Sequence, residues 1–325
     1  MSRLLGLATL TLALTLAATA ARADFRRERT LALESGGAFT LDSDIGEVVL
    51  TGGSASGARV VVTSDRDLDS DFEFTFDESA RAATVRIKRR SSLRRLFGGW
   101  SENGHTRITI QVPTPADVHL STAGGSISAS HLTGALDIRS SGGGLDVEAV
   151  DGNVDGNTSG GSIRMRGIRG NAVANTSGGG ITISDVGGTL KADTSGGGIS
   201  ITSVGGELRA STSGGGVDVR SAGGRVEASS SGGGVTVRFA AGNSSGGAVS
   251  SSGGPVRVEI DPAAHMSIDA SSSGGSVDSD VPITIQGKVA NDSLRGEMNG
   301  GGPLLRLRSS GGGVKIGRTS EGAKR

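Results

Sequence analysis

The chain has 325 residues, 33 of them basic and 33 acidic, so its formal net charge is zero. Without excess positive charge it lacks the bulk attraction that draws proteins to nucleic acid, and no nucleic-acid partner is expected. It has no cysteine, which excludes thiol chemistry, disulfides and cysteine-based metal sites.

Residues 1–23 have the features of a secretory signal peptide. Arg3 gives a basic start, an apolar run extends from Leu4 to Ala21, and Ala21-Arg22-Ala23 fits the small-x-small cleavage pattern. An uncleaved membrane anchor is the alternative, because the run is marginally long enough to span a bilayer. We expect cleavage and a mature chain with no transmembrane segment. That mature chain would have 31 basic and 33 acidic residues.

These features predict an exported protein, either periplasmic or extracellular. No cysteine follows the apolar run, so a lipoprotein anchor is not expected, and no sortase signal is present. The absence of both anchors favours the periplasm of a Gram-negative cell.

Residues 24–122 are predicted to form an irregular β cap at the N-terminal end of a stack of strands. Such a stack needs a cap against end-to-end pairing, and six of the seven Phe lie in this region. Phe72, Phe74 and Phe76 alternate onto one face. The expected strands are Thr30–Leu33, Phe39–Leu41, Val48–Thr51, Val60–Thr63, Phe72–Phe76, Thr84–Lys88 and Arg107–Val112.

Residues 123–248 carry a repeat with a fixed period of 18 residues. Such a short fixed period indicates one structural unit stacked on itself. Ser-Gly-Gly-Gly begins at Ser141, Ser177, Ser195, Ser213 and Ser231, with Ser-Gly-Gly-Ser at Ser159 and a degenerate copy at Ala123.

Apolar and polar side chains alternate within each repeat. We number each coil from the Ser of Ser-Gly-Gly-Gly as position 1. Positions 5, 7 and 10 are apolar in all seven coils, positions 14 and 16 are apolar in the first six except for Gly156 at position 16, and the columns between them are polar. This alternation is typical of strands with one buried face.

Two further columns predict how the coils turn and stack. Position 12 is Gly in all seven coils, from Gly134 to Gly242, which indicates a positive φ or backbone packing too close for a Cβ. Position 18 is Ser or Thr on the inward side. These hydroxyls are expected to hydrogen-bond to one another along the axis.

The sequence therefore predicts an all-β fold, a parallel β-solenoid (β-helix) with one coil per 18 residues. Strands are expected near positions 4–8 and 13–18. Seven coils at ~4.8 Å would give a rod of roughly 34 Å. The apolar spacing is not a strict six, which favours a right-handed coil over a left-handed hexapeptide helix. The number of faces, two or three, stays open.

After residue 248 the period slips. Residues 249–318 are predicted to form irregular C-terminal coils and a strand cap, with the excursion at Val281–Arg308 closing the end of the stack. Residues 319–325 are expected to be a frayed tail.

Several segments resemble a known family. Ile108-Thr-Ile-Gln-Val-Pro113, Val118-His-Leu-Ser-Thr and Gly125-Ser-Ile127 are similar to the entry to the repeat in the bacterial putative-adhesin, β-strand-repeat domain family of unknown function. Gly301-Gly-Pro-Leu-Leu-Arg-Leu-Arg-Ser-Ser-Gly-Gly-Gly-Val-Lys-Ile316 is similar to that family's last coil. The resemblance implies a β-solenoid exported to, or displayed at, the bacterial envelope. It supplies no catalytic residues.

One segment outside the repeat is rich in basic and apolar residues. It runs Arg86-Ile-Lys-Arg-Arg-Ser-Ser-Leu-Arg-Arg-Leu-Phe-Gly-Gly-Trp100. Such a segment is able to touch lipid headgroups or an acidic polymer. The alternative is a solvated hairpin whose apolar residues fold back onto the cap. The candidate contact residues are Arg86, Lys88, Arg89, Arg90, Arg94, Arg95 and Trp100.

Position 15 stacks Asp137 over Asp155 and Lys191 over Arg209. Outward carboxylates and bases of this kind form polysaccharide-lyase sites on β-solenoids, but Val173 separates the two pairs. With no Tyr and one Trp, the chain also offers almost nothing to stack on sugar rings. A solvated face of mixed charge is the simpler interpretation.

No motif predicts catalytic, cofactor-binding or metal-binding residues. The glycine runs lack the Lys-Ser/Thr of a phosphate loop, and the four His lack metal-ligand spacing. We expect a monomeric, non-enzymatic envelope protein, an adhesin or scaffold, that contacts an unidentified protein, polysaccharide or lipid headgroup. The alternatives are a carbohydrate-active β-helix enzyme and a solenoid that self-associates into filaments.

Overall fold

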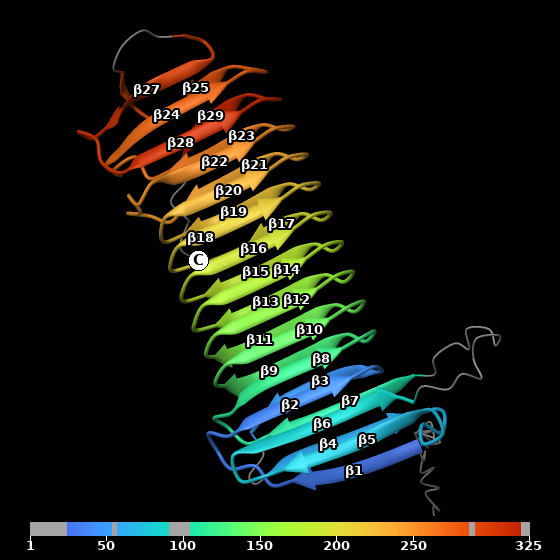
Figure 1. Ribbon diagram of the computed structural model, residues 1–325. Coiled ribbons are helices and arrows are strands. Elements are labelled where there is room, and N and C mark those ends of the chain that lie inside the picture. The colour runs from blue at the N-terminus through green and yellow to red at the C-terminus, as the bar shows by residue number, and fades with distance from the viewer. Residues whose placement is uncertain (1–24, 54–56, 91–104, 286–289, 320–325) are drawn as a thin grey trace, which may run out of the picture.

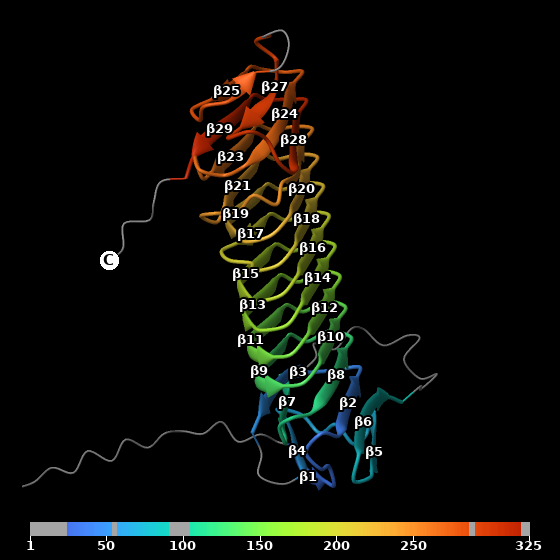
Figure 2. The ribbon, with the colours of Figure 1, turned by 90° about the vertical axis from the view of Figure 1, so that its left-hand side faces the viewer.

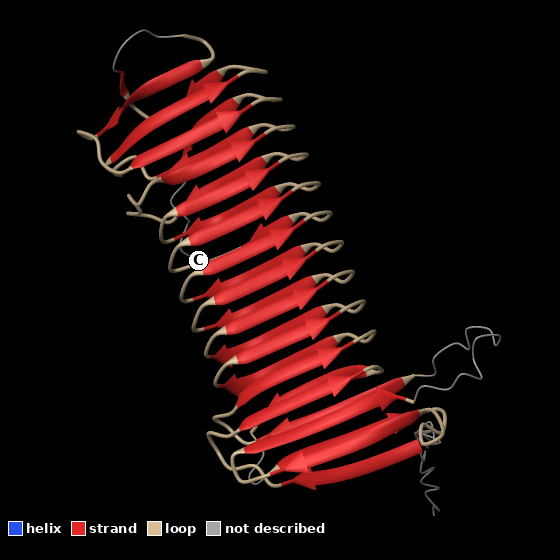
Figure 3. Cartoon of the chain, in the orientation of Figure 1, coloured by secondary structure: helices blue, strands red, loops and turns tan. Residues whose placement is uncertain are grey.

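The computed structural model describes residues 25–53, 57–90, 105–285 and 290–319. The expected signal peptide (1–23) and residues 320–325 of the expected tail lie outside these ranges. Within them every regular element is a strand, and the strands stack into a long rod (Figures 1 and 3). The predicted all-β solenoid is confirmed.

The strands of the described ranges form two sheets, which we call sheet A and sheet B. Sheet A has 14 strands in the spatial order β1 (Phe25–Leu31), β4 (Ala58–Ser64), β7 (Thr106–Val112), β3 (Glu47–Gly52), β9 (Ile127–Thr133), β11 (Leu145–Asp151), β13 (Ile163–Ile168), β15 (Ile181–Val186), β17 (Ile199–Ile201), β19 (Val217–Ala222), β21 (Val235–Phe239), β23 (Val256–Ile260), β29 (Val314–Arg318) and β25 (Val277–Ser279).

Sheet B has 15 strands and lies against sheet A (Figure 2). Its spatial order is β26 (Thr284–Ile285), β27 (Ser293–Met298), β24 (Met266–Ser272), β28 (Leu304–Ser309), β22 (Gly247–Ser251), β20 (Val226–Ser230), β18 (Leu208–Thr212), β16 (Leu190–Thr194), β14 (Ala172–Thr176), β12 (Val154–Thr158), β10 (Leu136–Ser140), β8 (Asp117–Thr122), β2 (Ala38–Ser43), β6 (Ala82–Arg89) and β5 (Phe72–Glu78).

Each regular coil gives one strand to each sheet, so the solenoid has two faces. Neighbouring coils pair in parallel, with equal positions opposite each other: Ile163, Ile181 and Ile199 form one column across sheet A. All three are buried. The apolar columns predicted from the repeat therefore form one continuous core between the two sheets.

The glycines of the turns are required by the close approach of successive coils. A Cβ on Gly179, at position 3, would overlap the backbone carbonyl of Gly161 in the coil before it. A Cβ on Gly188, at position 12, would lie 2.7 Å from the carbonyl oxygen of Gly170. Close packing thus explains most of the position 12 column. A positive φ is confined to its first and last members, Gly134 (φ 126°) and Gly242 (φ 75°).

The inward hydroxyls of position 18 do not bond to one another, so that prediction is wrong. Thr176 Oγ1 donates to the carbonyl of Gly161 at 2.8 Å and accepts from the backbone N–H of Gly179 at 3.3 Å. The same pair of bonds recurs at Thr158, Thr194 and Thr212. Each hydroxyl therefore ties the glycine turn that follows it to the glycine turn of the preceding coil.

Position 10 of the seventh coil also differs from the prediction. Ala240 is only half-buried, and Phe239 is buried in its place, opposite Ala222. The register shifts between Val219 and Ala222 at this step. Since the shift changes which side of the strand faces the core, the larger side chain turns inward.

Residues 38–52 form the first parallel coil of the rod. β2 pairs with β8, and β3 pairs with β9. β6 and β7 lie on the other side of this coil, and the antiparallel strands β1, β4 and β5 close the end. Phe25 stacks on Phe74 with ring centroids 5.7 Å apart, and the Arg27 guanidinium lies 4.3 Å above the Phe74 ring.

The C-terminal end is also interleaved. β28 lies between β22 and β24, and β29 lies between β23 and β25. β27 and β26 then cover the outer edge of β24 in antiparallel pairing. The segment at Val281–Arg308 therefore does two things: its early strands close the end of sheet B, and its last strand enters the sheet.

Candidate functional site

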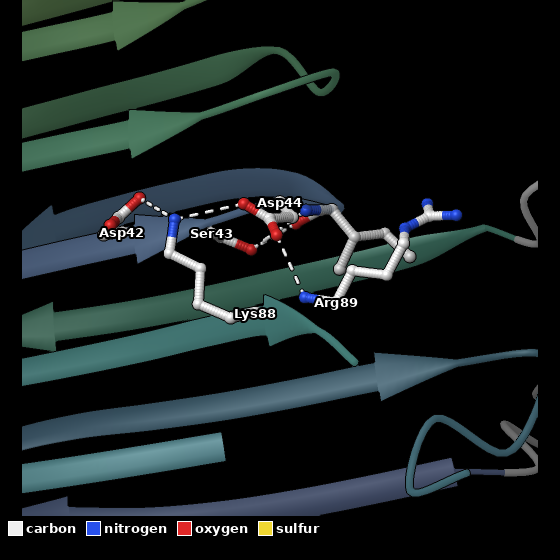
Figure 4. Close-up of polar contacts among 6 residues, drawn as sticks. Asp42, Ser43, Asp44, Lys88 and Arg89 are labelled. Carbon is white, nitrogen blue, oxygen red and sulfur yellow. Dashed lines mark hydrogen bonds and ion pairs between the residues drawn. The ribbon is translucent and has the colours of Figure 1, made fainter. Parts of the chain in front are cut away.

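The base of the basic segment is held by acidic residues of the first coil (Figure 4). Lys88 Nζ lies 2.7 Å from Asp42 Oδ1 and 3.1 Å from Asp44 Oδ1. Hydrogen bonds to Asp42 and then Asp44 raise the pKa of Lys88 despite partial burial. Burial alone would raise the pKa of Asp44, but bonds from the Arg89 N–H and Lys88 offset it and lower that pKa.

The other described basic residues of this segment also contact nearby groups. Arg86 forms an ion pair with Asp77 at 2.7 Å, and the Arg89 guanidinium lies 5.4 Å above the Phe72 ring. Arg90 donates from Nε to the Phe72 carbonyl. Arg86, Arg89 and Arg90 thus contact residues of β5 in the N-terminal cap. Arg94, Arg95 and Trp100 lie outside the described residues, so the anionic-surface contact stays a prediction.

The predicted column at position 15 is present on the outer face of sheet B. Asp137 faces Asp155, Val173 separates this pair from Lys191, and Lys191 faces Arg209. Arg139 binds both carboxylate oxygens of Asp137 at 3.0 Å. The hydrogen bond to Asp137 raises the pKa of Arg139 further. The acidic and basic pairs lie on different coils, and Asp137, Lys191 and Arg209 each have an oppositely charged partner within 4 Å.

A polar groove runs beside this column along the same face. Its volume is about 340 Å³, and we call it the hydroxyl groove. The side chains at position 17 form one wall. The serines at position 1, which open each glycine turn, form the other. The two walls consist of Ser121, Arg139, Asn157, Asn175, Asp193 and Ser211, and of Ser141, Ser159, Ser177 and Ser195.

Two asparagines are fixed in the middle of the groove. Asn157 Nδ2 donates to Asp155 at 2.7 Å, and Asn175 Nδ2 donates to Asn157 Oδ1 at 2.9 Å. Asn157 and Asn175 face each other in register in β12 and β14. Each amide keeps donor and acceptor capacity beyond these bonds, so the groove presents oriented hydrogen-bonding groups at these two neighbouring coils.

Sequence reasoning missed the hydroxyl groove. The signal was present, because position 17 is polar in every regular coil from Arg139 to Ser229. Positions 17 and 1 are two residues apart in the chain, so alternation places both on the outer side, but the sequence does not show that a groove lies between the two columns.

The outer face of sheet A has a different character. Asp146 pairs with Arg164, Glu148 with Arg166, and Asp151 with Arg169, at N–O distances of 3.9, 3.5 and 2.8 Å. Each pair joins neighbouring coils at equal positions, and all six side chains are more than half exposed. Such exposed pairs contribute little to stability, and they cancel the charge of this face.

Two classes of feature are not seen in the described ranges. No group of three His, Asp or Glu side chains there is arranged to hold a metal ion. Likewise, no helix among the described residues has the length and apolar character needed to cross a membrane.

Comparison with known protein families shows to which family the chain belongs. The profile of the family described as Toastrack DUF4097 matches residues 38–317. The chain belongs to this family. The match spans the first parallel coil through the interleaved last coil of the Toastrack fold and confirms the resemblance drawn from the repeat.

Solved structures similar to this Toastrack chain cover most of its length. A putative adhesin from Bacteroides fragilis is 12% identical, with 90% of this chain and 98% of that chain covered and a TM-score of 0.38. A putative adhesin from Parabacteroides distasonis is 14% identical, with coverage of 90% and 96% and a TM-score of 0.34. A putative lipid binding protein from the same organism is also 14% identical, with the same coverage and a TM-score of 0.33. A comparison with curated proteins finds no match.

Proposed function

We propose that this Toastrack-family protein is an exported, non-enzymatic component of the bacterial cell envelope that acts as an adhesin or scaffold. The observation that supports this proposal is the hydroxyl groove, a linear row of polar groups fixed on a rigid sheet. Its walls repeat once per coil, at about 4.8 Å. A surface of this kind fits an extended polymer with regularly spaced hydrogen-bonding groups.

The rigidity of the groove favours binding over catalysis. Asn157 and Asn175 are ordered before any ligand arrives, so little side-chain entropy is lost on binding. Catalysis needs an acid or base poised beside a reacting atom. Asp137 is instead neutralised by Arg139, and Lys191 lies 3.4 Å from Asp193.

Turnover assays test the non-enzymatic part of the proposal. The protein is incubated with envelope polysaccharides, and new reducing or unsaturated ends are measured. We expect none. Turnover that disappears in Asp137→Ala or Lys191→Ala would establish the carbohydrate-active alternative.

Fractionation and crosslinking in the producing cell test location and contact. A photo-crosslinking residue is placed at position 175 in the groove and, as a control, at position 200 on the outer face of sheet A. We expect the protein in the periplasmic or extracellular fraction, with an envelope component captured only from position 175. Retention in the cytoplasm, or equal capture from both positions, would contradict the proposal.

A further inference from the structure

The outer face of sheet B has a charge pattern that is complementary to its own reversal. The regular part of this face consists of the strands β8, β10, β12, β14, β16, β18 and β20, in this order, so β14 lies at its centre. Three outward columns cross these strands at positions 13, 15 and 17. Reversing the order of the strands about β14 brings each outward residue opposite the same position of a strand equally far from the centre.

This reversal brings opposite charges together. Position 15 gives the pairs His119–Glu227, Asp137–Arg209 and Asp155–Lys191, and Val173 falls opposite itself. Position 13 adds Asp117 opposite Arg225, and position 17 adds Asn157 opposite Asp193. Every other pair of these columns has at least one uncharged member, so no two like charges face each other.

Neighbouring arrangements lack this complementarity. A shift by one coil in one direction places Asp137 opposite Glu227, and a shift in the other direction places Asp117 opposite Glu207. Without the reversal, each charged residue falls opposite its own copy. Like charges directly opposite each other are destabilising, so the pattern favours the reversed order centred on β14.

The two halves of the face are also complementary in shape. A hollow of about 560 Å³ lies over the acidic half, and the carboxylates of Asp117, Asp137 and Asp155 line it. Asp117 accepts from the Ala135 N–H and Asp155 from the Asn157 amide. No cationic side chain in the described part of the chain lies within 4 Å of Asp117 or Asp155. The hollow therefore has room and negative charge for a cationic side chain.

The other half supplies long cationic side chains. Lys191, Arg209 and Arg225 project from β16, from β18 and from the residue before β20, and about half of each side chain is exposed. Their present carboxylate partners are the exposed neighbours Asp193, Glu207 and Glu227. Exposed pairs of this kind are weak, so these cations can contact a second carboxylate.

We propose that two copies of this chain bind face to face through the outer faces of sheet B, with antiparallel rods and a two-fold axis along β14. A half-turn about the strand direction reverses the order of the coils and keeps each position in place, so it produces the pairs given above. Each pair forms twice in such a symmetric contact. The caps prevent contact through the ends of the rod but not through this side, so the dimer replaces the monomer expected from the sequence.

The size of the contact makes the dimer reversible. Strands at ~4.8 Å and residues at ~3.3 Å give a regular face of about 34 Å by about 17 Å, or roughly 1,150 Å² over both copies. This area is at the lower limit of specific interfaces. The two hydroxyl grooves face each other along one edge of the contact and form a channel. The dimer thus leaves room for a polymer but does not rest on the proposed function.

Charge reversal tests the pairing in buffer without any ligand. We expect sedimentation to show a dimer that increases with protein concentration and decreases with salt. Asp155→Lys and Lys191→Asp each place like charges opposite each other twice, and each should lower the association constant about tenfold or more. The double variant restores the attraction and should return to within about threefold of wild type.

Asp146→Lys is the matched control, since it makes the same charge change on the outer face of sheet A. It should leave the association constant unchanged. A protein that is monomeric at every concentration would overturn the proposal. So would an equal loss in Asp146→Lys, or a double variant that associates as weakly as the single ones.

Cysteine crosslinking tests the geometry, because the chain has no native cysteine. Val173→Cys lies on the two-fold axis and should be joined to its copy by a short bis-maleimide, whereas Thr182→Cys on sheet A should not. Ser121→Cys lies six strand spacings, about 29 Å, from its copy. It should be joined only to Ser229→Cys chains in a mixture. Crosslinking of Ser121→Cys to itself, or equal crosslinking at Val173 and Thr182, would overturn the antiparallel arrangement.

Discussion

Met165 fills the space that Gly156 leaves open in the core. A Cβ on Gly156 would lie 2.6 Å from Met165 Cε, and no other residue at position 16 of the first six coils is a glycine. Met165 is likewise the only methionine at position 7. The two strands that carry these residues, β12 and β13, lie in opposite sheets, so the pair couples the two faces of the solenoid.

This complementarity predicts a compensating pair of mutations. Gly156→Ala should cost about 1–2 kcal/mol by overpacking, and Met165→Val about 1–2 kcal/mol by leaving a cavity. Together they recreate the Ala–aliphatic pairing of other coils, and the double variant should lie within about 0.5 kcal/mol of wild type. Chemical denaturation of the four proteins measures the coupling. Additive losses would show that the two side chains do not share one space.

The hydroxyl group of Thr176 should contribute more to stability than the volume of the Thr176 side chain. Thr176→Val keeps the shape but leaves the Gly161 carbonyl and the Gly179 N–H without their partner. We expect a loss of about 2 kcal/mol. Thr176→Ser retains the hydroxyl, as Ser140 and Ser230 do in their coils, and should lose less than about 1 kcal/mol. If the Val and Ser variants lost the same unfolding free energy, packing rather than hydrogen bonding would be the main contribution of position 18 to stability.

A strained backbone at position 9 should make one substitution stabilising. Ala149 has a φ of 56°, and the next coil has Gly167, φ 68°, in the same place. Left-handed backbone costs a residue with a Cβ about 1–2 kcal/mol, and the greater freedom of unfolded Gly offsets part of the gain. Ala149→Gly should therefore raise the unfolding free energy by about 0.5–1 kcal/mol. The control Ala192→Gly, in the buried extended strand β16, should lower it.

Asp269 should make stability depend on acid pH. Arg308 Nη2 donates to it at 2.8 Å, and Arg295 lies 3.6 Å away. The Arg308 hydrogen bond lowers the pKa of Asp269, although burial opposes this. Because the folded pKa is below the ordinary value of 3.8, the stabilisation is present above that pH and is lost as the pH falls through the folded pKa.

Asp269→Asn should thus be about 1 kcal/mol less stable than wild type at neutral pH, a figure reduced by the partial exposure of the arginines. The difference should shrink below pH 3.8. Asp146→Asn removes a more exposed carboxylate 3.9 Å from Arg164 and should have an effect within about 0.5 kcal/mol. A loss in Asp269→Asn that is constant with pH would rule out the carboxylate charge as its cause.

The repeat allowed the regular coils to be predicted residue by residue. A period of 18 residues assigns each side chain to a column, and alternation assigns each column to a side. The partners of the hydroxyls at position 18 were not predictable in this way, because they depend on how closely the turn of Gly161 approaches Thr176. The inward turn of Phe239 depends on a register shift that leaves no mark in the period.

The interleaved C-terminal coils and the hydroxyl groove are further features that could not be predicted from the sequence. Ser309 has the surroundings of a regular coil, but nothing in the spacing says that its neighbour is Ser272 on one side and Ser251 on the other. Order in space departs from order in the chain there. The hydroxyl groove lies between two columns, positions 17 and 1, that are two residues apart in the chain, but its hollow shape is seen only in the fold.

Binding to envelope fragments of the producing cell tests most directly whether the hydroxyl groove is the contact surface. The groove variant is Asn157→Ala/Asn175→Ala, and the control is Thr182→Ala/Ser200→Ala on the outer face of sheet A. Loss of two amide contacts should weaken binding about tenfold or more, while the control binds as wild type does. Unchanged binding by the groove variant, or an equal loss in the control, would contradict the account.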